Sequence, residues 1–164
     1  MWKIILTVCI IVVIIAVVLI PYLKQPKITE ETKKNFSVEK FYGVIQGNGY
    51  TINGLNKALV KNNYGKISDL KINADFNGEY SGYIGTIAEA NSGTITDIEV
   101  NGSFDINLYT PNKFSTPIFG AVVGINEPAG IIERTSFNGN ANIRMTVSDA
   151  SVGGIVGYNQ GRIN

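Results

Sequence analysis

Asp69 and Asp97 are the two residues of this sequence whose type and spacing best match a catalytic arrangement. They stand at equivalent places in two similar stretches, so strands stacked side by side would hold their carboxylates about 5 Å apart. Carboxylates at such a distance serve glycoside hydrolases and Ca²⁺ sites. A third similar stretch carries Arg134-Thr135 instead, and surface charges are mostly just solvated. We therefore interpret both aspartates as solvent-facing, and a polysaccharide-degrading β-helix is the least favoured function.

Histidine and cysteine, two of the commonest catalytic and metal-binding side chains, are missing from the body of the chain. Histidine does not occur, and the single cysteine, Cys9, lies within an apolar N-terminal run. These facts exclude a His/Cys metal site, a histidine general base and a disulfide there. We expect a protein that is not an enzyme and has no catalytic residue, cofactor or metal. The formal net charge of +1 predicts no nucleic-acid partner.

Residues 1–23 are predicted to be a transmembrane signal-anchor. Ile4–Ile20 is an uncharged, apolar run of 17 residues, which as a helix would extend roughly 25 Å and nearly cross a bilayer. Trp2 and Tyr22 flank it, as interfacial aromatic residues do. A cleavable signal peptide is the competing interpretation, but the run is long for one and no small-x-small cleavage site follows it. The predicted location is the cell membrane, crossed once.

Residues 24–40, rich in Lys and Glu, are predicted to be a charged stalk or linker.

Residues 41–164 contain internal repeats. Four segments align: KALVKNNYGKISDLKI, GTIAEANSGTITDIEV, GAVVGINEPAGIIERTSF and GGIVGYNQGRIN. One asparagine of each segment falls in a common column: Asn63, Asn91, Asn126 and Asn159. A column of glycines follows at spacings of 28, 37 and 31 residues: Gly65, Gly93, Gly130 and Gly161. An isoleucine column comes next: Ile67, Ile95, Ile131 and Ile163.

Each column has a physical interpretation. Asn followed by Gly suits a bend between strands, because both residues tolerate positive φ. In stacked repeats the Asn side chains would hydrogen-bond from one to the next as a turn ladder, and carbohydrate binding by this column is less favoured. The isoleucine would point into the core at the start of a half-buried strand. A single repeat cannot bury its apolar face alone, so neighbours must stack. The sequence thus predicts an all-β fold, a parallel β-solenoid of about four coils, preceded by one transmembrane helix.

These repeats resemble the GLUG motif, whose copies follow the pattern GGLVGxNxGxIxN. The segment VGGIVGYNQGRIN matches that pattern almost position for position, and Phe41–Leu55 is similar to the segment that begins such arrays. Two features depart from it: Lys57-Ala58 replaces the opening glycines of the first repeat, and Ser68-Asp69 or Thr96-Asp97 stands where Asn-Cys is frequent. The resemblance implies a non-catalytic repeat region of bacterial surface and secreted proteins, including regions upstream of the catalytic domain in immunoglobulin-A-cleaving zinc metallopeptidases.

The resemblance also implies an extracellular body, although lysines are more numerous after the apolar run than before it and would favour the opposite orientation. We expect a membrane-anchored surface protein with an adhesive or structural display role. The alternative is the N-terminal repeat region of a larger surface metallopeptidase. A glycan or a protein is the expected partner on one face, where aromatic side chains would contribute: Tyr50, Tyr64, Tyr80, Tyr83, Tyr109 and Tyr158. The last coil is incomplete at Asn164, so a partner or further chain is expected to cap it.

Overall fold

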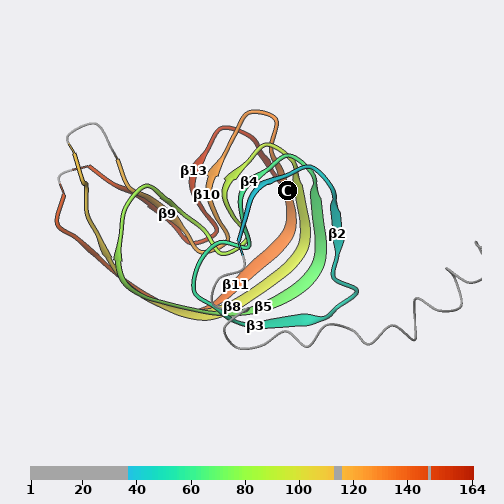
Figure 1. The fold of residues 1–164 in the computed structure, drawn as a ribbon, viewed down its shortest axis with the longest axis horizontal. Helices are drawn as coiled ribbons and strands as arrows, with labels where there is room; N and C mark the ends of the chain where they lie inside the picture. The colour runs from blue at the N-terminus through green and yellow to red at the C-terminus, as the bar shows by residue number, and fades with distance from the viewer. Residues whose placement is uncertain (1–36, 113–115, 148) are drawn as a thin grey trace, which may run out of the picture.

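A computed structural model describes residues 37–112, 116–147 and 149–164. These residues form an all-β fold of parallel strands in stacked sheets, without a helix (Figure 1). The all-β prediction is thereby confirmed, and the architecture is compatible with the predicted β-solenoid. No helix that could cross a membrane is present in the described ranges. The predicted signal-anchor, residues 1–23, and most of the predicted linker, residues 24–40, lie outside them.

Sheet A collects one short strand from each passage of the chain. Its strands, in order, are β1 (Val38–Phe41), β4 (Val60–Asn63), β7 (Ala88–Asn91), β10 (Val123–Asn126) and β13 (Val156–Asn159). All neighbouring pairs are parallel and superpose equivalent positions of successive repeats. The first strand begins at Val38, inside the predicted linker. It does so because Val38 and Phe41 pack against the core and Glu39 forms an ion pair of 2.7 Å with Lys61.

Sheet B contains the longest strands. Its strands, in order, are β14 (Arg162–Ile163), β11 (Ile131–Met145), β8 (Thr94–Leu108), β5 (Lys66–Tyr80) and β2 (Val44–Gln46), and β3 (Thr51–Leu55) also pairs with β5. Three strands, β5, β8 and β11, have 15 residues each. In β5, buried and exposed residues alternate from Leu70 to Asn77, as expected of a strand with one face in the core and one in solvent. The last strand, β14, pairs only with Ile131 and Ile132 of β11.

Sheet C is small and contains no strand from the first passage of the chain. It consists of β12 (Ser151–Gly153), β9 (Ile118–Gly120) and β6 (Tyr83–Ile84), in this order. Figure 1 shows the long strands curving along one side of the molecule, after which the chain returns through sheet C toward sheet A. Sheet C packs closely on sheet A, because a Cβ added to Gly124 would lie 3.1 Å from the Cβ of Tyr83.

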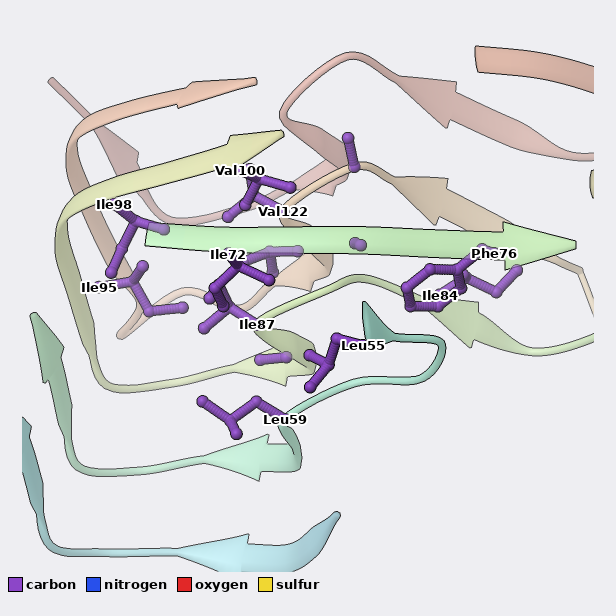
Figure 2. Packing of buried hydrophobic residues seen from close by; sticks show 14 of the residues in the cluster. Leu55, Leu59, Ile72, Phe76, Ile84, Ile87, Ile95, Ile98, Val100 and Val122 are labelled. Carbon is purple, nitrogen blue, oxygen red and sulfur yellow. The ribbon is translucent and has the colours of Figure 1, made fainter. Parts of the chain in front are cut away.

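The core fills the space between the three sheets. Phe104 of β8 lies between Phe76 of β5 and Phe119 of β9, with ring centroids 5.3 Å and 5.4 Å away. Figure 2 shows Ile72 and Val100 from the long strands close to Ile87 and Val122 from the connections into sheet A. These aliphatic side chains are all fully buried. Each repeat therefore contributes apolar groups that only its neighbours can cover.

Candidate functional sites on the stacked repeats

The four asparagines of the predicted column form one chain of hydrogen bonds. Asn63 Nδ2 donates to Asn91 Oδ1 at 2.7 Å, Asn91 Nδ2 donates to Asn126 Oδ1 at 2.8 Å, and Asn126 Nδ2 donates to Asn159 Oδ1 at 2.8 Å. The first three side chains are buried. A buried amide that lacks a hydrogen-bond partner lowers the stability of the folded protein. Each link of this chain satisfies one donor and one acceptor inside the protein. These three amides are consequently not accessible to a carbohydrate.

Glycine is required in the second column for a reason other than the predicted tolerance of positive φ. Among the described residues, none of the four asparagines or four glycines of the two columns has a positive φ, so the expectation of left-handed turns here was wrong. A Cβ at Gly65 would collide with the carbonyl oxygen of Gly43, and a Cβ at Gly93 would collide with that of Gly65. The turns stack so closely that successive backbones touch. Glycine is required by this approach of main chain to main chain.

The isoleucine column also needs one correction. Ile95 lies beside Ile67 and beside Ile132, and Ile132 pairs with Ile163, whereas Ile131 lies beside Thr94. The third repeat therefore contributes Ile132 to this column rather than the predicted Ile131. Ile132 comes two residues after the glycine of its repeat, as the isoleucines of the other repeats do, whereas Ile131 follows Gly130 directly. The third turn is longer only before Gly130, where Glu127, Pro128 and Ala129 separate it from Asn126. The exposed residues of that turn add length without changing the strand register.

Left-handed backbone occurs at a second bend, within the long strands. Asp69, Asp97 and Arg134 have φ values of 57°, 56° and 43°, and each is skipped in the pairing between residues that are otherwise in register. Aspartate tolerates this conformation better than most residues. The two predicted aspartates thus lie at equivalent bends of adjacent strands, and Arg134 continues the same column.

The carboxylate of Asp97 is hydrogen-bonded to the guanidinium group of Arg134. Arg134 Nε donates to Asp97 Oδ1 at 2.6 Å, and Nη2 donates to Asp97 Oδ2 at 2.9 Å and to Thr96 Oγ1 at 2.8 Å. The hydrogen bond from Arg134, followed by that from Thr96, lowers the pKa of Asp97 from 3.8 to about 2. A carboxyl group with this pKa is ionised at neutral pH and is unsuited to act as a general acid. Arg134 follows Gly130 by four residues, as Asp97 follows Gly93, so the sequence already aligns them.

The outward-facing side chains of β5, β8 and β11 make a broad polar surface, which we name the outer face of sheet B. The register superposes its positions in columns: Lys71, Glu99 and Ser136; Asn73, Asn101 and Asn138; Asp75, Ser103 and Asn140; Asn77, Asp105 and Asn142. Asn53 of β3 extends the asparagine column, and Asn73 Nδ2 donates to its Oδ1 at 2.6 Å. Ion pairs of 3.3 Å and 2.8 Å join Lys71 to Glu99 and Arg144 to Asp105.

The tyrosines do not gather on one face. Tyr64 stacks on Tyr42 with a centroid distance of 4.9 Å and an interplanar angle of 11°, at the turn between sheets A and B. Tyr158 lies in β13 of sheet A. Tyr80 and Tyr83 both line a cavity beside β6. No motif or repeat column indicates this cavity or its acidic residue, Glu89.

Among residues 37–112, 116–147 and 149–164, no group of three or more His, Cys, Asp or Glu side chains could hold a metal ion. The chain matches no known protein family model, no curated protein and no solved structure. The candidate sites are therefore defined by the geometry of this molecule alone: the buried asparagine ladder, the outer face of sheet B and the cavity beside β6.

Proposed function

We propose that this chain is a non-enzymatic, membrane-anchored repeat protein whose body is displayed outside the cell in an adhesive or structural role. The outer face of sheet B is the observation that carries the proposal. It repeats polar columns across three strands of 15 residues, and its neighbouring side chains pair with one another. A broad, regular and polar surface of this kind suits contact with a glycan or a protein.

We also assign the fold to the parallel β-solenoids and the repeats to the GLUG type. The stacked order of the strands in sheets A and B supports the first assignment. The second is supported by the column of asparagines, each bonded to the next, and by the glycine column beside it. The two columns correspond to the Asn and the following Gly that the pattern GGLVGxNxGxIxN specifies.

The membrane attachment in this proposal depends on the sequence of Ile4–Ile20. This run is uncharged and long enough to approach the thickness of a bilayer. The charged segment after it would then hold the repeats away from the lipid surface. A non-catalytic role is supported by the engagement of Asp97 with Arg134, which keeps the Asp97 carboxylate ionised at neutral pH and so unable to act as a general acid.

The proposal is tested by expressing the full chain with a C-terminal epitope and fractionating the cells. We expect the protein in the membrane fraction, resistant to carbonate extraction. Protease added to intact cells should remove the epitope, and a cytoplasmic marker protein should survive in the same sample. Permeabilised cells provide the control for protease sensitivity. Recovery in the soluble fraction would contradict the anchor, and full protection in intact cells would contradict the extracellular body.

A further inference from the structure

A small cavity lies beside β6, the edge strand of sheet C that comes first in the sequence. Its volume is about 90 Å³, and its lining includes Lys57, Phe76, Tyr80, Ser81, Tyr83 and Glu89. The cavity exists because the first passage of the chain contributes no strand to sheet C. In addition, β3 ceases to pair with β5 after Leu55 and Ala74, so no neighbouring strand among the described residues covers the end of β5 on that side.

The position of Glu89 in its column explains why a long acidic side chain fits there. The register of sheet A aligns Glu89 with Gly124 and Gly157 of the next two strands. Side chains cannot be placed at either glycine, because a Cβ at Gly124 would lie 2.6 Å from the Glu89 carbonyl oxygen and one at Gly157 would lie 2.6 Å from Phe119 O. Sheet C covers sheet A at both glycines. At Glu89 that cover is missing, and the side chain lines the cavity instead.

The charged groups of the cavity are not paired with each other or with the rest of the described residues. Lys61 forms an ion pair with Glu39 at 2.7 Å, whereas no hydrogen bond or ion pair within the described ranges engages the side chain of Glu89 or Lys57. Glu89 is half-buried, and this burial is the largest cause of its raised pKa. Lys61, beside Glu89 in the register of β4 and β7, attracts its carboxylate but forms no hydrogen bond with it. A partly buried carboxylate without a hydrogen-bond donor is costly. A ligand that supplies hydrogen-bond donors would lower this cost.

Aromatic rings form the remaining wall of the cavity. The centroids of Phe76 and Tyr80 are 5.8 Å apart with an interplanar angle of 36°, and the nearby Tyr83 is 44% exposed. Figure 2 shows Phe76 beside Ile84 at this end of the core. Phe76 is 1% exposed, so Tyr80 and Tyr83 are the rings of this wall that a ligand could contact. Such rings bind the C–H face of a sugar ring, while carboxylate, ammonium and hydroxyl groups bind its hydroxyls.

We propose that this cavity binds one hexopyranose residue at the end of a glycan, with Glu89 accepting hydrogen bonds from its hydroxyls and Lys57 and Ser81 donating to them. The assignment rests on the proposed surface role and names the class of ligand. The volume of about 90 Å³ equals about three water molecules in the liquid. It therefore admits part of one ring, which selects a terminal residue rather than a buried internal one.

The test uses the full chain, purified in a detergent without a sugar headgroup. Saturation-transfer NMR and calorimetry measure binding of the methyl pyranosides of glucose, galactose, mannose and N-acetylglucosamine. We expect at least one of them to bind, and the Glu89→Gln variant to bind it at least tenfold more weakly. The matched control is Glu127→Gln, which alters a carboxylate in the turn after β10, away from the cavity lining and from the outer face of sheet B, and should leave the affinity unchanged. Circular dichroism establishes that both variants remain folded.

Two outcomes would overturn the assignment. One is that none of the four pyranosides binds. n-Butylamine is tested in the same assay, and if it alone binds, the cavity is a site for amines and not for sugars. The other is that folded Glu89→Gln binds as tightly as the unaltered chain. Neither outcome touches the proposed surface role, because that role is tested by membrane fractionation and by protease on intact cells. A chain exposed on cells that binds no pyranoside would keep the proposed function and lose this inference.

Discussion

The Nδ2 group of Asn91 donates a hydrogen bond of 2.8 Å to Oδ1 of Asn126, although 35 residues separate them in the sequence. Both side chains are fully buried. In the other direction, Oδ1 of Asn91 accepts from Asn63 at 2.7 Å. Asn91 therefore links three successive repeats, and the stacking of their turns depends on amide groups that water cannot replace.

Replacing Asn91 by Ala should destabilise the protein by about 2–4 kcal/mol, because the Nδ2 of Asn63 and the Oδ1 of Asn126 would each lose a partner in the core. Urea unfolding of the full chain measures the change. Asn159→Ala is the matched control, since Asn159 is exposed and ends the ladder, and it should cost less than about 1 kcal/mol. Equal losses in the two variants would show that the ladder does not stabilise the stack.

Gly93→Ala should be destabilising by about 2–3 kcal/mol, as expected when atoms are forced into filled space. Its Cβ would collide with the carbonyl oxygen of Gly65, so two repeats would have to separate. Gly154→Ala is the control, because a Cβ there has no atom within 4 Å. The midpoint of urea unfolding should fall for the first variant and stay nearly constant for the second. A tolerated Gly93→Ala would mean that the turns stack less closely than described.

Local sequence patterns predict some features of this fold, whereas others follow only from the packing of distant segments. The columns of Asn and Gly could be found in the sequence because each repeat preserves the order of residues around its turn. Close contact between successive backbones at Gly65 and Gly93 could not be found, because φ preference and steric exclusion both favour glycine. The cavity beside β6 was equally invisible. It arises where the first passage of the chain lacks a strand of sheet C, and the other repeats carry Lys61, Gly124 and Gly157 at the position of Glu89, so no repeated residue type marks the site.

Acid should weaken the protein through Asp97. The hydrogen bond from Arg134 lowers the pKa of Asp97 from 3.8 to about 2, so the folded state binds this proton less readily than the unfolded state. The associated stability is present above the unfolded pKa and is lost as the pH falls from 3.8 to about 2. Urea midpoints across this range should decline less steeply for Asp97→Asn than for the unaltered chain. Asp69→Asn is the control; a slope changed equally by both substitutions would contradict the assignment to Asp97.

Phe104→Ala should remove about 3–5 kcal/mol of stability, because Phe104 is fully buried between neighbours from β5 and β9. Phe137→Ala should cost less, since Phe137 is only half-buried at the next strand. Thermal and urea unfolding of both variants provide the comparison. A larger loss for Phe137 would place the centre of the core elsewhere in the stack.

The parallel register of β5 and β8 underlies the display surface and is tested most directly by disulfide trapping. Asp75 lies beside Ser103 in this register, and neighbouring parallel strands are about 4.8 Å apart, within the range that a disulfide can bridge. In a Cys9→Ser background, the pair Asp75→Cys and Ser103→Cys should form an intramolecular disulfide rapidly, without loss of stability. The pair Asp75→Cys and Asp105→Cys, one outward position further along β8, should not. Equal rates for the two pairs, or cross-links only between molecules, would contradict the stacked repeats on which the proposed function depends.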